Sequence, residues 1–239
     1  MAGRKIASTE PGAAEGDSHV SVTIGRYLEA IFYIEAEGEI VRASRLADWL
    51  GVSQPTASAT LQRMMREDLI EVSHAKAVTL TKSGRREAAS IVRRHRIAER
   101  WLTDYVGLDW AQADEEASRL EHALSDGVAD RLLELIGRPT TCPHGNPIPG
   151  VDAPRFPERA LSTLPAGETA HVQRISEVAE HEAPELLRFL GEHGFRMGIP
   201  VTTVESSRAA GTVTVRVGDE PGSTVTLSFE VAAKIWLRA

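Results

Sequence analysis

The most constraining feature of this chain is a helix, a glycine turn, a second helix and a hairpin in close succession. Residues 42–50 place apolar side chains on one helical face, and Gly51 interrupts the pattern. A second amphipathic run follows over residues 53–67, and residues 69–81 alternate like two short strands around a polar tip. This order predicts a winged helix-turn-helix, whose second helix enters the major groove of DNA.

The start of the second helix carries short polar side chains, which suits contact with base edges and phosphates. Pro55 is tolerated there because the first helical turn has no use for its missing N–H. The same sequence could cap an ordinary helix in a bundle, but the turn before it and the hairpin after it favour DNA recognition. The predicted DNA contacts are Arg42, Arg45, Ser53, Gln54, Pro55, Thr56, Ser58, Gln62, Arg63 and, at the wing tip, Lys76.

Charge is distributed unevenly along the chain, whose formal net charge is -7. Residues 40–100 hold 12 Lys or Arg against 6 Asp or Glu, a balance of +6 that leaves -13 for the remainder. A basic segment suits the DNA backbone, although a solvated charged face would have the same composition.

The remaining pattern predicts a mainly α chain with a small β domain at its C-terminal end. Apolar periodicity indicates helices over residues 25–37, 83–105, 110–124, 126–136 and 182–191, and strands over 168–175, 199–204, 212–217 and 224–229. Six of the twelve prolines lie within residues 139–157, which predicts an extended linker. The expected units are a disordered lead (1–20), the winged helix (21–82), a helical dimerisation unit (83–138), the linker (139–165) and a barrel-like domain (166–239).

Targeting signals are not evident in the sequence. Cys142 is the single cysteine and cannot form an internal disulfide, which agrees with a reducing compartment. No stretch approaches the roughly 20 apolar residues of a membrane span, and the N-terminus has no apolar signal core. We therefore expect a cytoplasmic protein without a membrane partner.

Two polar stripes on consecutive predicted helices can face each other. His95 and Glu99 share one helical face because they are four residues apart. The next helix presents Asp114, Ser118, Glu121 and His122. Imidazole and carboxylate ligands suit Mn(II) or Fe(II), and Zn(II) or Co(II) could substitute in vitro. Each stripe could instead be a solvated face, since three arginines flank His95.

Three runs resemble the diphtheria toxin repressor family, including its manganese-transport-regulator branch. They are RHRIAER at 94–100, LEHALSD at 120–126 and PHGNPIPG at 143–150. The match covers residues 27–150 closely and the remainder more loosely. It implies a homodimer that Fe(II) or Mn(II) activates to repress metal-uptake genes, with a C-terminal SH3-like (FeoA-like) domain.

A dimer also suits the sequence, because two reading heads related by two-fold symmetry match a palindromic double-stranded operator. The apolar surface expected to meet the partner consists of Trp101, Leu102, Leu120, Leu124 and Leu132.

The resemblance also implies a set of metal ligands. It covers His95, Glu99, Glu121 and His122, a first-helix carboxylate at Glu29 and, from the C-terminal domain, Glu177 and Glu180. Arg26 and Ser118 depart from the family because each stands where relatives have a ligand, and Asp114 replaces a histidine of the iron-type members. We therefore expect Arg26 to form a salt bridge with Glu121 at a degraded primary site. Binding would then depend on His95, Glu99, Asp114, Glu177 and Glu180.

Two alternatives remain open. Loss of two liganding positions could leave a winged-helix transcription factor that no longer depends on metal. A metallohydrolase could instead use His95, Glu99, Glu121 and His122, with a carboxylate as general base. No second cluster in the sequence would orient a substrate, so we do not expect an enzyme.

Overall fold

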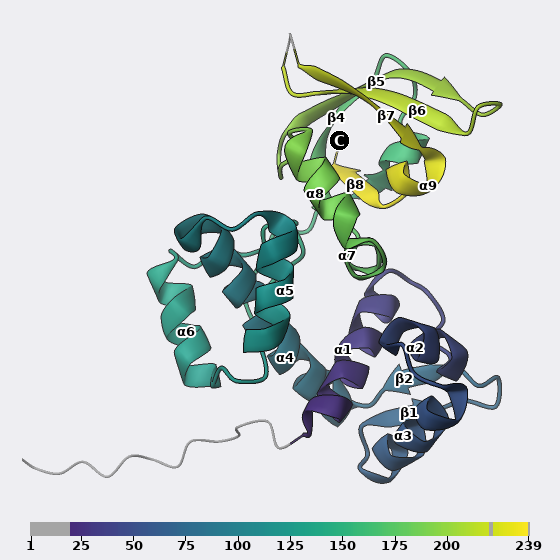
Figure 1. Cartoon of the computed structure of the whole chain (residues 1–239), viewed down its shortest axis with the longest axis vertical. Helices are drawn as coiled ribbons and strands as arrows, with labels where there is room; N and C mark the ends of the chain where they lie inside the picture. Colours follow the sequence, from purple (N-terminus) through teal and green to yellow (C-terminus); the bar gives the residue numbers. More distant parts are fainter. Residues whose placement is uncertain (1–19, 220–221, 239) are drawn as a thin grey trace, which may run out of the picture.

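The computed structural model describes residues 20–219 and 222–238, which form three units along the chain (Figure 1). The predicted disordered lead falls almost wholly outside the described residues, which begin at Val20.

The N-terminal unit is a winged helix-turn-helix. Its elements are α1 (Val22–Ala36), α2 (Ala43–Leu50), α3 (Gln54–Arg66), β1 (Ile70–Val72) and β2 (Val78–Leu80). Gly51 ends α2 with a left-handed φ of 63°, which glycine adopts without a Cβ clash. Ser53 caps α3 because its side chain accepts the N–H of Thr56. β1 and β2 pair antiparallel with Ile70 opposite Leu80, which turns both side chains into the core.

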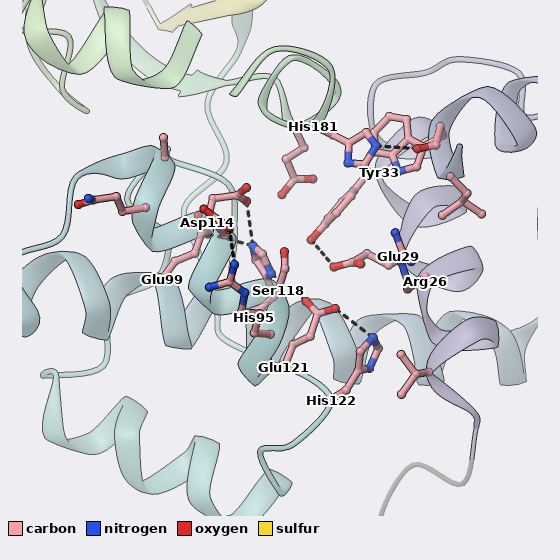
Figure 2. Close-up of a pocket in the computed structure, with 18 of the residues that line it drawn as sticks. Arg26, Glu29, Tyr33, His95, Glu99, Asp114, Ser118, Glu121, His122 and His181 are labelled. Carbon is pink, nitrogen blue, oxygen red and sulfur yellow. Dashed lines mark hydrogen bonds and ion pairs between the residues drawn. The ribbon is translucent and has the colours of Figure 1, made fainter. Parts of the chain in front are cut away.

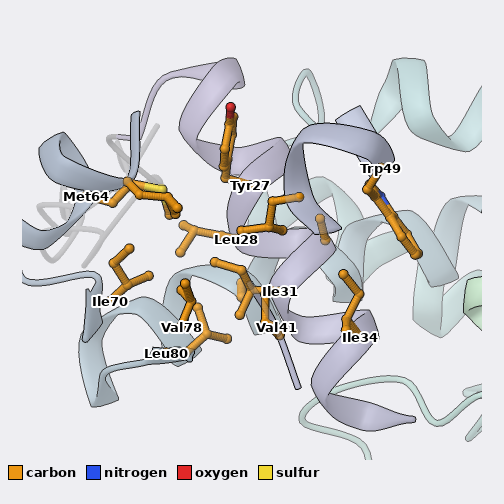
Figure 3. Packing of buried hydrophobic residues seen from close by; sticks show 14 of the residues in the cluster. Tyr27, Leu28, Ile31, Ile34, Val41, Trp49, Met64, Ile70, Val78 and Leu80 are labelled. Carbon is orange, nitrogen blue, oxygen red and sulfur yellow. The ribbon is translucent and has the colours of Figure 1, made fainter. Parts of the chain in front are cut away.

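Apolar residues three or four apart on α1 build the core of this unit (Figure 3). Leu28, Ile31 and Ile34 are fully buried and lie opposite side chains from α3 and the hairpin, including Met64 and Leu80. The spacing that predicts the helix therefore also determines which face of it packs.

The central unit contains three α-helices. They are α4 (Lys82–Trp101), α5 (Trp110–Leu120) and α6 (Asp126–Leu135), with a π-helical segment (Leu102–Val106) after α4. The sequence predicts one helix over residues 83–105, and the chain is helical from Lys82 to Val106, with its last five residues in π-helical rather than α-helical form. Gly107 adopts a left-handed φ of 84° and its N–H donates to the carbonyl of Leu102, so the final turn widens.

The predicted partner surface packs largely within the chain. Leu102 is 6% exposed and lies against alanines of α4 and α5. Three further predicted residues, Trp101, Leu120 and Leu124, are partly buried against the same cluster, and Leu132 packs on another. The large apolar side chains exposed on this unit are instead Tyr105, Val106, Val128 and Leu135.

Residues 139–157 do not form a simple extended linker. Cys142, His144, Asn146 and Ile148 are buried. The N–H of Ile175 donates to the His144 carbonyl (2.9 Å), and the Asn146 amide donates to the Ile175 carbonyl (3.0 Å). This segment is therefore packed between the C-terminal domain and the central helices, since Ile148 also lies in an apolar cluster with Ile97 and the Pro149 carbonyl accepts a hydrogen bond from Arg93 (3.0 Å).

The C-terminal unit is a six-stranded antiparallel sheet with strand order β3-β8-β4-β5-β6-β7. The strands are β3 (Glu158–Ala160), β4 (Thr169–Ile175), β5 (Pro200–Ser207), β6 (Thr212–Val217), β7 (Ser223–Ser228) and β8 (Ile235–Arg238). The helices are α7 (Glu177–Glu182), α8 (Pro184–Glu192), α9 (Phe229–Ala232) and a 3-10 turn at Leu161–Thr163. Sequence analysis missed β3, β8, α7 and α9 because three to six residues carry too little periodicity.

Helix α7 lies between the C-terminal sheet and the two helical units (Figure 1). Its Val178 is fully buried in the core of the winged helix. From the other side, Trp110 of α5 joins the core of the C-terminal sheet. The three units therefore share side chains at their junctions.

Candidate metal centre and nucleic-acid interface

A cavity of about 600 Å³ opens where α1, α4, α5 and α7 meet (Figure 2). Every metal ligand predicted from the sequence lines it except Glu180, whose side chain lies outside the described structure. Its polar lining includes Glu29, His95, Glu99, Asp114, Ser118, Glu121, His122 and Glu177.

His95 stands at the centre of the cavity and is 6% exposed. Its Nδ1 lies 2.8 Å from Glu121 Oε2, and its Nε2 lies 3.4 Å from Asp114 Oδ1 and 3.7 Å from Glu99 Oε2. Burial opposes the charged imidazolium, but hydrogen bonds to Asp114 and Glu121 outweigh it and hold the pKa of His95 well above its usual value. One imidazole thus serves two groups of carboxylates.

These two groups each bring potential ligand atoms within 4.8 Å of one another. The Asp114 cluster consists of His95, Glu99 and Asp114, and the Glu29 cluster consists of Glu29, His95 and Glu121. Burial of Asp114 is outweighed by its hydrogen bond to His95, so the pKa of that carboxyl is lowered. Both clusters offer oxygen and imidazole nitrogen, the donor set that suits Mn(II) or Fe(II).

Glu29 faces the cavity from α1, where the Tyr33 hydroxyl donates to its Oε1 over 2.9 Å. Burial, followed by the nearby Glu121 carboxylate, raises the pKa of Glu29 well above its ordinary range. Buried carboxylates this close together repel one another unless a cation or a proton lies between them.

A third cluster was missed from the sequence. Glu99, Cys142 and His144 are all buried and have ligand atoms within 4.8 Å of one another, which defines the Cys142 cluster. His144 Nδ1 lies 3.1 Å from Glu99 Oε1, whereas Glu99 Oε2 faces His95. The Cys-Pro-His spacing of residues 142–144 was the available signal, but these residues were assigned to an extended linker. A cysteine sulfur beside an imidazole is a donor pair that suits Zn(II) and Fe(II) as well.

Arg26 does not form the predicted salt bridge with Glu121. In the described structure, Glu121 instead contacts His95 and, at 3.2 Å from its Oε1, His122 Nε2. Burial, then Arg94 and Arg26, lowers the pKa of His122. Figure 2 places Arg26 on α1 beside Glu29. The Glu121 carboxylate therefore contacts the imidazoles of His95 and His122. Arg26 affects this end of the cavity through the electrostatic effect of its positive charge.

His122 approaches α1 closely because residue 25 is glycine. A Cβ built on Gly25 would lie 2.7 Å from His122 Cε1, closer than real contacts allow. Ser118 is exposed at the cavity edge.

Glu177 has a partner within the chain. Arg96 of α4 donates from Nε to Glu177 Oε1 over 2.9 Å, and a terminal nitrogen of the same guanidinium makes a second contact. Both side chains are buried. Burial raises the pKa of Glu177, although Arg96 opposes the shift. Glu177 is thus held at the cavity wall by an arginine and belongs to none of the three clusters.

The alternative of a solvated basic face around His95 is wrong. Arg94 and Arg96 are each 4% exposed. Arg94 donates to the Glu121 carbonyl (2.6 Å) and to Asp126 (2.7 Å), so it ties α4 to the turn after α5.

The predicted DNA contacts gather on the winged helix. On α3, Gln54, Pro55, Thr56, Ser58, Gln62 and Arg63 are exposed, as are the cap residue Ser53, the α2 cap residue Arg42 and, at the wing tip, Lys76. Some of these groups have partners already. The Ser53 and Thr56 hydroxyls lie 2.8 Å apart, and Arg63 donates to Glu67 over 2.7 Å. Arg45 pairs with Glu39 at 3.5 Å.

A winged helix joined to a buried imidazole and carboxylate cavity defines the class of metal-regulated DNA-binding proteins. Three family models match in succession. They are "Iron dependent repressor, N-terminal DNA binding domain" over residues 19–78, "Iron dependent repressor, metal binding and dimerisation domain" over 81–150, and "FeoA domain" over 159–239.

Relatives extend this match over most of the chain. The iron-dependent repressor IdeR of Mycobacterium tuberculosis is 35% identical over 206 residues, covering 86% of this chain and 87% of its own. The diphtheria toxin repressor of Corynebacterium efficiens is 37% identical over 191 residues, covering 76% and 83%. The chain therefore belongs to the diphtheria toxin repressor (DtxR/MntR) family, as the sequence motifs predict.

Solved structures agree in fold. A manganese-dependent transcriptional repressor in complex with manganese superposes with a TM-score of 0.80 at 34% identity, covering 90% of this chain and 99% of its own. The IdeR of T. acidophilum gives 0.74 at 27% identity, covering 92% and 99%. The predicted architecture of winged helix, helical unit and FeoA-like domain is confirmed. No helix in the described ranges is long and apolar enough to cross a membrane.

Proposed function

We propose that this chain is a cytoplasmic, metal-dependent transcriptional repressor that controls genes of manganese or iron homeostasis. The observation that carries the proposal is the buried cavity in which His95 is shared by the Asp114 cluster and the Glu29 cluster. It lies between the α1 helix of the DNA-binding unit and the α4 and α5 helices of the central unit. A ligand bound there would contact the helices that determine the position of the winged helix that binds DNA.

The donor groups fit a divalent cation. Glu99 is buried, and its two carboxylate oxygens face imidazoles, with Oε1 3.1 Å from His144 Nδ1 and Oε2 3.7 Å from His95 Nε2; a cation between these groups would offset the cost of burying the carboxylate. When bound, such an ion would supply the positive charge that these carboxylates otherwise draw from the protonated His95. Mn(II) and Fe(II) suit the oxygen-rich clusters, and the relatives described above are named for iron or manganese.

We propose further that the protein binds a palindromic operator as a homodimer. Support comes from the match to a metal-binding and dimerisation domain model and from the exposed apolar side chains of the central unit. Two winged helices related by two-fold symmetry would read two half-sites one helical turn or a multiple apart.

The test is a titration of chelator-stripped protein with Mn(II) and Fe(II) while operator binding is followed by fluorescence anisotropy. We expect binding to tighten with metal. Equal, tight binding in chelator would favour the metal-independent transcription factor instead. The hydrolase alternative has no support in the relatives, which are named as repressors.

We propose that the Asp114 cluster governs activity. Glu99 is the one carboxylate shared by the Asp114 and Cys142 clusters, and Arg26 disfavours a dication near Glu29 and His122. Glu99→Gln should therefore abolish metal-stimulated DNA binding, and Glu121→Gln should leave much of it. Arg26→Asp should strengthen metal binding near Glu29, since it adds a ligand and removes a positive charge.

Calorimetric Mn(II) titrations of wild type and these three variants, run beside the DNA assay, decide whether the Asp114 cluster or the Glu29 cluster governs activity. Cys142→Ser separates the Cys142 cluster from the Asp114 cluster, because it changes only the former. If Glu121→Gln loses the metal response and Glu99→Gln keeps it, the Glu29 cluster is the governing site.

A further inference from the structure

Helix α7 touches both the metal cavity and the DNA-binding unit. At its start, Glu177 lies at the cavity and pairs with Arg96 of α4. One turn later, the His181 ring stacks on Trp49 of α2 with ring centroids 4.1 Å apart and an interplanar angle of 1°. His181 Nε2 also lies 2.8 Å from the Trp49 carbonyl oxygen, to which it can donate. Between these contacts, Val178 is buried in the core of the winged helix.

Trp49 in turn contacts a predicted DNA-binding residue. The guanidinium carbon of Arg45 lies 5.3 Å from the centroid of the Trp49 ring, within range of a cation–π interaction. Arg45 is on α2, the helix that crosses the DNA backbone in a helix-turn-helix. A continuous run of side chains, His181, Trp49 and Arg45, therefore joins α7 to the face expected to meet phosphates.

We propose that the His181–Trp49 contact is a positioning element that holds the DNA-binding unit at a set angle to the metal cavity and orients Arg45 toward the operator. The inference deepens the proposed function and rests on it. It differs from a role in metal ligation, because His181 lines the same cavity but belongs to none of the three clusters of potential ligand atoms among the described residues.

The contact is separable from the fold. Trp49 is 8% exposed, whereas His181 remains exposed beyond its stacked face, so removal of the imidazole opens no core. An aromatic pair of this kind changes an equilibrium by about two- to tenfold.

The chain offers a matched control at the far end of the C-terminal unit. The His193 ring packs on Phe189 with the same centroid distance of 4.1 Å, and His193 Nδ1 lies 2.8 Å from the Phe189 carbonyl oxygen. Both residues lie in or next to α8, so His193→Ala removes similar chemistry without touching the winged helix.

The experiment compares full-length wild type, His181→Ala, His181→Phe and His193→Ala. Hydrogen exchange of residues 43–50 is measured without metal or DNA, Mn(II) affinity by calorimetry, and operator affinity at saturating Mn(II). For His181→Ala we expect faster exchange in α2, operator binding weaker by about two- to tenfold, and unchanged Mn(II) affinity. His181→Phe should retain most of the operator affinity because it keeps the stacking, and His193→Ala should match wild type.

Three outcomes would overturn the inference. They are unchanged exchange in α2, equal losses for His181→Ala and His193→Ala, or a loss of Mn(II) affinity that accounts for the loss of operator binding. If wild type shows no metal response, the proposed function fails, while the exchange comparison still decides whether α7 restrains α2.

Discussion

Helix α1 separates two buried regions of opposite chemistry. On one face, Leu28 and Ile31 pack into an apolar core that excludes water and charge. On another, Glu29 and Tyr33 face a cavity of carboxylates and imidazoles. Burial stabilises the first region with or without a bound metal ion, because apolar contact requires neither a cation nor a proton. The second gathers like charges, so its stability depends on protons and cations. The same helix therefore borders two regions. We call the apolar region the permanent core, because its stability needs no ion, and the polar cavity the conditional core, because its stability depends on bound protons or cations.

The largest effect should come from breaking the permanent core. Ile31 is fully buried, so Ile31→Ala removes apolar contacts and leaves a cavity, which costs about 2–5 kcal/mol of unfolding free energy. Urea unfolding with and without Mn(II) should show the same loss in both conditions. Ile40→Ala is the control, since Ile40 is 60% exposed and should change stability little. A loss that Mn(II) reverses would contradict the separation of the two regions.

The conditional core should respond to metal. Mn(II) at one hundred times its Kd should raise the unfolding free energy of wild type by about 2.7 kcal/mol, because it binds the folded state alone. His95→Ala should remove this gain, since His95 belongs to both the Asp114 and Glu29 clusters. Ile31→Ala should retain it. Thermal melts over a Mn(II) series provide the measurement, and a gain that survives His95→Ala would place the ion elsewhere.

A smaller effect should follow pH in the metal-free protein. The pKa of His95 is raised on folding, so its stabilising contribution is full below about pH 6.5 and is lost as pH rises through the folded pKa. The pKa of Glu29 is also raised, so the folded state favours the protonated form of this carboxyl. Loss of that proton as pH rises therefore lowers the stability further. The pKa of His122 is lowered by a smaller amount, so the contribution of His122 to stability increases as pH rises.

Melts at pH 6, 7 and 8 in chelator should therefore show falling stability. Saturating Mn(II) should flatten or reverse the slope, because the ion binds deprotonated ligands. The lowered pKa of Asp114 matters only in acid, where that carboxyl gains its proton. Metal-free stability that rises across this range would show that the protonated His95 does not stabilise the cavity.

The smallest effect on stability should come from a change at Gly25 of α1, where the His122 ring approaches the helix closely. Gly25→Ala puts a Cβ 2.7 Å from His122 Cε1 and 3.1 Å from Ile91 Cδ1, but the ends of both side chains can move, and alanine favours the helix by about 1 kcal/mol. We expect nearly unchanged unfolding and a His122 ring displaced from α1, visible as a shifted imidazole signal by NMR. Gly127→Ala, where a Cβ meets no atom within 4 Å, is the control. An unshifted signal would mean that Gly25 does not position His122.

Much of the fold was predictable because it is local. The α2 and α3 helices, the Gly51 turn and the hairpin each depend on residues close in sequence. The polar stripes are local too, since the i, i+4 spacing of His95 and Glu99 brings both side chains to one face of α4. Their meeting with Asp114 on α5 follows from two amphipathic helices that pack side by side.

Other parts of the site could not be predicted, because they join segments far apart in the chain. Arg96 meets Glu177 across 81 residues, and His181 reaches Trp49 across 132. Neither pairing leaves a periodic trace in the sequence.

The sequence by itself thus determined the secondary structure that reads DNA, the family and the residue types offered to a metal. Tertiary structure alone decided that Cys142 and His144 face Glu99. It also decided that Glu121 contacts His95 and His122 instead of Arg26, and that α7 contacts both the cavity and α2. The physical reason is that local propensity determines which face of each element is polar. Partners for buried charges are chosen only when distant elements pack and exclude water.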